Sequence, residues 1–291
     1  MKKLVLVYNP VSGHATFKNK LDEIIEKFQQ RGCMLLVYRT QRCNDSLPEF
    51  IRESGAEGVV AAGGDGTLHE VANILVKNQL HLPLAIIGSG TSNDFASYLG
   101  VTEDIDAYID VIAAGRTRKV DLGKCGEEYF VNVASAGMLT SIAHEVDPRL
   151  KHSLGKMAYY LHSIGELPNF RAIPLHITAD GKEYEERAFF FLAANSGTVA
   201  GFKHAIADAS LEDGLLDLLL VRQCSLPEFM ALAAELVAGR SILHRPSVLH
   251  VQAAAMEIVS AAVLDSDLDG ELGPQLPLRL EAVPGALEIY C

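Results

Sequence analysis

Strand-like and helix-like patterns alternate along the first 115 residues, and this alternation restricts the fold more than any other feature of the chain. Between short apolar runs, apolar residues recur every three or four positions, as on one face of a helix; the clearest case is Leu68, Val71, Ala72 and Leu75. Strands joined by crossover helices run parallel to one another. We therefore predict an α/β domain with a parallel sheet over residues 1–120. The other predicted elements are the strands Leu4–Tyr8, Leu35–Tyr38, Gly58–Ala62 and Pro83–Ile87 and helices containing Phe17–Phe28 and Ile105–Ile112.

The pattern changes from about Arg118 onward, where short apolar or alternating runs dominate. Asp180-Gly181 separates two such runs and predicts a hairpin, because this pair tolerates positive φ. Helical patterns interrupt the strands at 155–167 and 225–238. We predict a β-sandwich domain over residues 121–281, with the segment from about 282 to 291 packing back on the first domain. The expected strands contain Lys119–Leu122, Tyr129–Ala134, Leu175–Ala179, Ala188–Ala194 and Leu215–Val221.

Composition excludes several classes of protein. The net charge of −12 argues against a protein that binds nucleic acid, because such proteins carry an excess of Lys and Arg. No run reaches the roughly 18 apolar residues of a spanning helix, so we expect no transmembrane segment. The first apolar run is a strand and not a secretory signal. Five cysteines lack any Cys-x-x-Cys pair, which favours reduced thiols in a cytoplasmic protein.

The most informative local motif is Gly63-Gly64-Asp65-Gly66-Thr67, which follows a predicted strand and precedes a helix expected to begin at Thr67. Glycines let the backbone approach an anion closely, and the amides at a helix start favour negative charge by about 0.3–1 kcal/mol. Thr67 and Glu70 have the spacing of a capping box. The motif is neither a Walker loop nor a Rossmann fingerprint. An ordinary capped strand-to-helix turn remains the alternative.

Two similar turns follow other predicted strands, at Asn9–Gly13 and Gly88–Asp94. In an open parallel sheet, ligands bind outside the carboxyl ends of the strands, so we expect all three turns to meet at one edge. Asp65 and Asp94 would then be available to hold Mg²⁺ through its water shell, as phosphoryl transfer requires.

Together these motifs resemble the diacylglycerol-kinase catalytic domain, and most closely the soluble bacterial diacylglycerol and lipid kinases. The resembling motifs are Asn9-Pro-x-Ser-Gly13, Gly63-Gly-Asp-Gly-Thr67 and Gly90-Thr-x-Asn-Asp94, followed in the family's order by Val120-Asp121-Leu122-Gly123, Phe130-x-Asn132, Leu211-Glu-Asp213-Gly214-Leu215 and Asp269-Gly270-Glu271. Their joint occurrence in order is far more specific than any single motif, and the resemblance covers essentially the whole chain.

The resemblance implies a kinase that uses ATP and Mg²⁺ to phosphorylate a lipid hydroxyl at the membrane surface, with the acceptor entering a cleft between the domains. It implies a homodimer, and a cytoplasmic protein in reversible peripheral contact with the membrane. Asp269 would be the general base. The residues implied to bind nucleotide are Asn9, Thr40, Gly63, Gly64, Asp65, Gly66, Thr67, Glu70, Thr91, Asn93 and Asp94. Asp65, Asp94 and Asp121 would organise the catalytic Mg²⁺, and Ser210, Asp213 and Leu215 a structural ion.

Several alternatives stay open. The run Asp265–Gly270 imitates the opening of a calcium loop, but its twelfth position is Leu276 and Pro274 and Pro277 oppose an exit helix. A solvated acidic hairpin is the plainer interpretation. NAD kinase shares the glycine loop, and a non-catalytic nucleotide or lipid sensor would keep the fold. The sequence identifies neither the lipid nor any role of Lys18, Lys151 or Lys156 in binding phosphate or headgroup.

Overall fold

The computed structural model describes residues 1–12, 16–90, 93–101, 104–137, 172–199, 201–202 and 205–291. The chain forms two compact units: the first contains Met1–Leu122 and Val283–Cys291, and the second contains Gly123–Ala282. The C-terminal segment thus belongs to the same unit as the N-terminus. The predicted helix at 155–167 lies outside the described residues, and so do Lys151 and Lys156.

The first unit is built on a parallel sheet of short, buried strands. In order across the sheet they are β4 (Leu84–Gly88), β3 (Val59–Gly63), β1 (Lys2–Tyr8) and β2 (Cys33–Arg39). Strand β3 is buried at every position, as expected for a strand covered on both faces. All four carboxyl ends therefore lie along the same edge.

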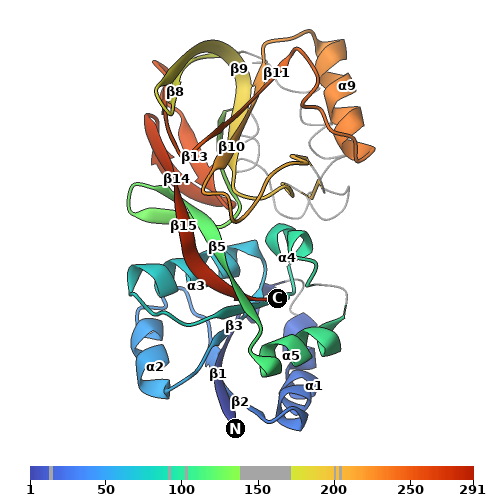
Figure 1. Ribbon diagram of the computed structural model, residues 1–291, viewed down its shortest axis with the longest axis vertical. Coiled ribbons are helices and arrows are strands. Elements are labelled where there is room, and N and C mark those ends of the chain that lie inside the picture. Colours follow the sequence, from blue (N-terminus) through green and yellow to red (C-terminus); the bar gives the residue numbers. More distant parts are fainter. Residues whose placement is uncertain (13–15, 91–92, 102–103, 138–171, 200, 203–204) are drawn as a thin grey trace. The chain divides into compact units, whose positions relative to one another are not determined.

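Helices cover both faces of this sheet (Figure 1). Helices α1 (Thr16–Gln30) and α5 (Ile105–Ala114) lie on one side, and α2 (Leu47–Ser54) and α3 (Asp65–Lys77) lie on the other. Phe17, Ile24 and Phe28 of α1 pack with Ile109 and Ile112 of α5 in one core. Helix α2 and the short helix α4 (Asp94–Tyr98) were not predicted, because eight and five residues are too few for a clear helical period.

The end of strand β15 (Leu278–Tyr290) completes the first unit. Ile289 pairs with Leu84 of β4 in parallel. The Tyr108 hydroxyl donates to the Tyr290 carbonyl at 3.1 Å and accepts from the Ile86 amide at 3.1 Å. Burial raises the pKa of Tyr290 to about 12 and also raises the pKa of Tyr108, so both phenols stay neutral and able to donate.

The second unit is antiparallel at every strand pairing that the structure defines within it. Strand β5 enters it from the first unit, and β15 leaves it. Its strands are β5 (Thr117–Cys125), β6 (Glu128–Phe130), β7 (Val133–Gly137), β8 (Ile173–Ala179), β9 (Lys182–Ala194), β10 (Leu216–Arg222), β11 (Val248–Ala253), β12 (Ala255–Val259), β13 (Asp265–Leu268), β14 (Glu271–Gln275) and β15.

Two hydrophobic layers form in this unit because antiparallel strands alternate their side chains between faces. On β10, Leu218 joins one layer, while Leu219 joins a second layer that includes Phe229 and Leu232 of helix α9 (Leu226–Val237). The Ser225 side chain caps α9, as the predicted helix start requires. In the described part of the chain, the structure shows no helix of the length and apolarity that crossing a membrane requires.

The predicted hairpin at Asp180-Gly181 is present between β8 and β9. Asp180 has φ 44° and Gly181 has φ 80°, so both central residues are left-handed, as a two-residue hairpin turn of this kind requires. The Asp180 carboxylate also accepts hydrogen bonds from the Ala254 and Ala255 amides at 2.9 Å each. The turn therefore also ties the β8–β9 hairpin to the start of β12.

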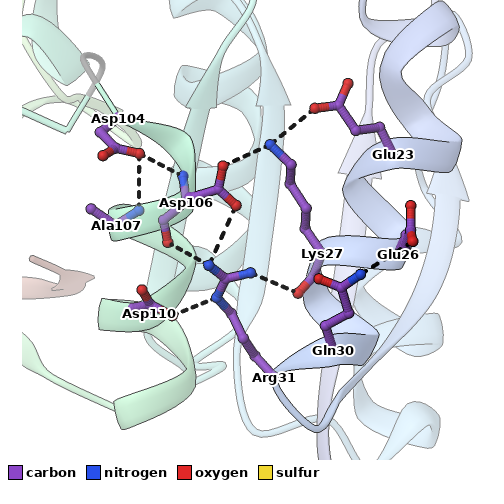
Figure 2. Close-up of polar contacts among 9 residues, drawn as sticks. All are labelled: Glu23, Glu26, Lys27, Gln30, Arg31, Asp104, Asp106, Ala107 and Asp110. Atoms are coloured by element: carbon purple, nitrogen blue, oxygen red, sulfur yellow. Dashed lines mark hydrogen bonds and ion pairs between the residues drawn. The ribbon is translucent and has the colours of Figure 1, made fainter.

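A network of charged groups joins α1 to α5 in the first unit (Figure 2). Lys27 donates to Asp106 at 2.8 Å, and Arg31 donates to the carboxylates of both Asp106 and Asp110. Asp104 caps α5 by accepting from the amides of Asp106 and Ala107. The hydrogen bond from Lys27 is the main cause that holds the pKa of Asp106 below its ordinary value of 3.8. A network shared among several charges is worth more than an isolated surface pair.

We predict that Asp106→Asn lowers the melting temperature at neutral pH and low salt. The folded-state pKa of Asp106 is lowered, so its stabilising effect is present above the unfolded-state pKa and is lost as pH falls through the folded-state value. The deficit should therefore shrink toward acid pH and in high salt, which screens exposed charges. Calorimetry measures the melting temperature of Asp106→Asn and of the control variant Asp22→Asn, which changes an exposed acid of α1. Equal melting temperatures for the two variants at neutral pH would contradict the prediction.

Candidate functional site

The loops that follow the four parallel strands lie together at the carboxyl edge of the sheet. The Asn9 amide donates to the Ala62 carbonyl at 3.0 Å, and the Thr40 amide donates to the Tyr8 carbonyl at 3.0 Å. The Ser89 amide donates to the Gly63 carbonyl at 2.8 Å. Ladder hydrogen bonds thus continue past the strand ends and bring the three motif turns to one edge, the place where open α/β sheets bind ligands.

Glycines are required where two of these turns cross. A Cβ on Gly90 would lie 2.5 Å from the Gly64 Cα, and a Cβ on Gly63 would lie 2.3 Å from the Thr67 Oγ1. The first contact is with backbone, which cannot rotate away as a side chain can. The two loops therefore approach one another closely, as only residues without a bulky side chain allow.

Asp65 and Asp94 meet at the same place. The Asp65 Oδ1 accepts a hydrogen bond from the Asp94 amide at 2.9 Å, and the Asp94 side chain is buried. Asn93, at φ 49°, closes the turn before α4: its Oδ1 accepts from the Gly90 amide at 2.8 Å and its Nδ2 donates to the Gly90 carbonyl at 3.0 Å. The motif thus joins the Asp65 carboxylate to the backbone at the start of α4, next to the Asp94 side chain. Thr91 lies outside the described residues.

The predicted start of helix α3 was wrong. The helix begins at Asp65 with Gly64 at its N-cap and no side-chain cap, so Thr67 is inside the first turn. The buried Thr67 Oγ1 accepts from the Asn9 Nδ2 at 3.2 Å and packs over Gly63 instead of capping. No capping box forms, because the glycine turn itself already starts the helix. Asn9 instead links the turn after β1 to the glycine turn after β3.

Glu70 has a partner that sequence reasoning missed. Its Oε1 accepts from the Asn44 Nδ2 at 2.7 Å, and Asn44 also bonds the backbone of Gln41 in both directions. Asn44 is buried, so this amide ties the loop after β2, with Thr40, to helix α3. A single Asn in a polar loop carries no periodic or motif signal that would have indicated this contact.

Asp121 has a different partner. Its Oδ1 accepts from the Gly285 amide at 2.7 Å, so the returning C-terminal segment orients this buried carboxylate. Among the described residues no three His, Cys, Asp or Glu side chains gather closely enough to hold a metal ion directly.

The other implied ion loop lies in the second unit, just before β10. The Glu212 amide donates to the Ser210 Oγ at 3.2 Å, and the Leu215 amide donates to the Asp213 Oδ1 at 3.0 Å. Two side-chain turns in succession hold this loop, and Asp213 is exposed at its centre. Carbonyl oxygens and one carboxylate are ligand types that a hard cation accepts.

Asp269 lies in the turn of the β13–β14 hairpin, also in the second unit. Its Oδ2 accepts from the Val131 amide at 2.7 Å, and its Oδ1 accepts from the Asn132 and Val133 amides at 2.8 and 2.9 Å. The hairpin is confirmed, but it is not simply solvated, since Ser266, Asp267 and Leu268 are buried. The acidic run itself forms strand β13 and the turn that leads into β14, so the calcium-loop interpretation, which needs a loop between helices, is wrong.

Comparisons with known proteins match both parts of the chain. Residues 3–125 match the family described as diacylglycerol kinase catalytic domain, and residues 132–291 match the YegS C-terminal NAD kinase beta sandwich-like domain. The predicted fold class, a parallel α/β part followed by a β-sandwich, is confirmed.

Individual relatives match along nearly the full length. A diacylglycerol kinase of Staphylococcus carnosus (strain TM300) is 33% identical, over 99% of this chain and 95% of that protein. One of Staphylococcus aureus (strain bovine RF122 / ET3-1) is 34% identical, over 99% and 92%. The crystal structure of a diacylglycerol kinase from Bacillus anthracis str. Sterne aligns with a TM-score of 0.81 at 26% identity, over 99% of this chain and 96% of that one.

We predict that Gly90→Ala destabilises the first unit more than Gly64→Ala does. The added methyl group at residue 90 meets the Gly64 Cα at 2.5 Å, whereas the one at residue 64 meets the Gly90 Cα at 3.3 Å. Overpacking of this kind costs roughly 1–3 kcal/mol. Denaturant unfolding measures the difference. Equal losses of unfolding free energy would mean that the two loops do not cross as closely as described.

Proposed function

Because the chain belongs to the diacylglycerol kinase family, we propose that it transfers the γ-phosphate of ATP to a hydroxyl group of diacylglycerol or a related lipid. The family resemblance identified in the sequence is confirmed for both parts of the chain. The observation that carries the proposal is the meeting of three polar, glycine-containing turns at one edge of a parallel sheet, where the loops at Gly64 and Gly90 approach closely.

The nucleotide would bind at this edge. Gly63–Thr67 would face the phosphates, because backbone amides at a helix start favour negative charge. The link from Asn9 to Thr67 supports this loop from the neighbouring strand. Thr40 and Glu70 would contact the remainder of the nucleotide, and Asn44 holds Glu70 to Gln41, the residue after Thr40. Thr91 and Asn93 would close the far side.

Mg²⁺ would be held by Asp65 and Asp94 through its waters, with Asp121 completing the acidic set. The hydrogen bond from the Asp94 amide to the Asp65 carboxylate brings the two residues together. One or two carboxylates are the usual protein share of a Mg²⁺ site in which substrate phosphates and water supply the other ligands. When bound, the ion neutralises charge on the β- and γ-phosphates. Ser210, Asp213 and Leu215 would hold a second, structural ion in the second unit.

Asp269 would act as the general base. The acceptor hydroxyl oxygen attacks the γ-phosphorus, the bond from that phosphorus to the β–γ bridging oxygen breaks, and the hydroxyl proton passes to the Asp269 carboxylate. The products are a phosphorylated lipid and ADP. Three backbone amides fix the direction of this carboxylate, which a base needs because proton transfer depends on hydrogen-bond reach.

We further propose a cytoplasmic homodimer that meets its lipid by peripheral contact with the membrane surface. NAD kinase chemistry is the second candidate, because the family matched by residues 132–291 is described by its likeness to the NAD kinase sandwich. The two are separated by offering labelled ATP with either diacylglycerol vesicles or NAD. Phosphorylation of NAD alone would remove the lipid proposal, and nucleotide binding without transfer to any lipid extract would favour a non-catalytic relative.

We predict that Asp269→Asn lowers kcat by about 10²–10⁴-fold, because the amide side chain cannot accept the proton. Asp265→Asn, an exposed acid of the same hairpin, is the control and should keep wild-type kcat. Mass spectrometry of a total lipid extract treated with ATP and each variant identifies the phosphorylated lipid and measures the loss. Wild-type turnover by Asp269→Asn would exclude the residue as the base.

We predict that Asp65→Asn raises the Mg²⁺ concentration needed for half-maximal activity roughly tenfold or more, because groups that orient a hydrated ion contribute about 10–100-fold to its affinity. Glu53→Gln, at an exposed acid of α2, is the control. Activity is titrated with Mg²⁺ at saturating ATP. An unchanged midpoint would show that Asp65 does not organise the ion.

A further inference from the structure

We propose that Asn132, Asn195 and Ser196 are positioning residues for Asp269. They form a buried polar clamp, defined by these three side chains and the Thr198 carbonyl, that holds the backbone donors of the base in place. The inference rests on the proposed role of Asp269 as general base.

The backbone amides that donate to the Asp269 carboxylate lie in and next to the two-residue connection between strands β6 and β7. Strand β6 ends at Phe130 and β7 begins at Val133, so Val131 and Asn132 lie between them. Their amides, with that of Val133, donate to the carboxylate of Asp269. The Asp269 amide returns a hydrogen bond to the Val133 carbonyl at 2.9 Å, which holds the turn at φ 54°. The direction of the carboxylate therefore depends on how this short segment is held.

The clamp holds that segment from the end of β9. The Asn195 Nδ2 donates to the Val131 carbonyl at 2.9 Å, and the Asn195 amide donates to the Asn132 carbonyl at 2.8 Å. The Asn132 Nδ2 donates to the Thr198 carbonyl at 3.0 Å, and the Ser196 hydroxyl donates to the Asn132 Oδ1. Asn132 is thus bonded through its amide, its carbonyl and both ends of its side chain.

Burial makes this arrangement specific. Asn195 and Ser196 are 0% exposed and Asn132 is 7% exposed. A buried polar group without a partner costs about 1–3 kcal/mol, so each member of the network constrains the orientation of the others. An apolar core would stabilise the unit without directing any peptide group. The polar clamp instead directs two peptide groups toward one carboxylate.

Ser196→Ala tests the clamp with the smallest change, because it removes one hydroxyl and leaves Asn132 in place. We expect kcat to fall roughly ten- to hundredfold with the KM for ATP unchanged, since small displacements of a catalytic group have effects of that size. Ser247→Ala is the matched control: this serine is also buried in the second unit, but its hydroxyl has no partner among the described residues. Thr198→Val is a second control, because the groups of Thr198 that bond the clamp are its backbone carbonyl and amide, which this substitution keeps.

Hydrogen–deuterium exchange supplies a readout independent of turnover. The amides of residues 131–133 should exchange faster in Ser196→Ala than in wild type or either control, while the melting temperature confirms that each variant is folded. Should Ser196→Ala not fold, Asn195→Ala, which removes the donor to the Val131 carbonyl, is measured in the same way. Wild-type kcat and wild-type exchange in a folded clamp variant would overturn the proposal.

Asp269→Asn in the same series separates the two proposals. If Asp269→Asn is inactive while Ser196→Ala keeps wild-type kcat, the clamp inference fails and the base assignment stands. If Asp269→Asn keeps wild-type kcat, the base assignment fails, and the positioning role fails with it even if exchange at 131–133 increases. Loss of kcat in both, with faster exchange at 131–133 in Ser196→Ala than in the Ser247→Ala and Thr198→Val controls, supports both proposals.

Discussion

The close approach of two backbone segments, at Gly64 and Gly90, is the constraint on which the first unit's site depends. Any side chain at residue 90 would meet backbone at 2.5 Å, so the loops after β3 and β4 can cross in this way only with glycine at residue 90. That crossing brings Asp65 to the amide of Asp94 and lets helix α3 start directly from the turn. The loop after β1 adds Asn9 to the same edge. The loop after β2 adds Thr40, which precedes the Gln41 that Asn44 joins to Glu70. The parallel sheet brings the loops to one edge, and glycine at residue 90 lets two of them approach closely.

In the second unit, the structural requirement is to orient one carboxylate, that of Asp269. Its candidate base is held by peptide groups, and those peptide groups are held by buried Asn and Ser side chains from another strand. In the first unit, glycine at residue 90 lets two loops meet at one edge of the sheet. In the second unit, buried polar side chains orient the peptide groups that bond Asp269. In both units the polar groups are already oriented before substrate binds, so binding costs little conformational entropy.

Sequence patterns predicted most of the parallel sheet, because its strands are continuous apolar runs and its helices have one regular apolar face. The order of motifs also indicated Asp269 as the general base, which stays a prediction. They could not predict what surrounds Asp269, since Val131–Val133 lie more than 130 positions earlier and bond it with peptide groups that every sequence possesses. The partnership of Asn44 with Glu70 was hidden for a similar reason, and the capping box failed because Thr67 is buried over a glycine.

The return of residues 283–291 to the first unit has a consequence for biosynthesis. Tyr290 completes the core around Tyr108, and a Cβ at Gly58 would collide with the Tyr290 ring, so this residue fills space that no nearer part of the chain occupies. On the ribosome, the first 122 residues emerge long before that ring does. The N-terminal half of the nascent chain must therefore wait, with its core unfinished, until the whole antiparallel unit has been translated. A chaperone that recognises exposed apolar surface would meet the protein during that interval.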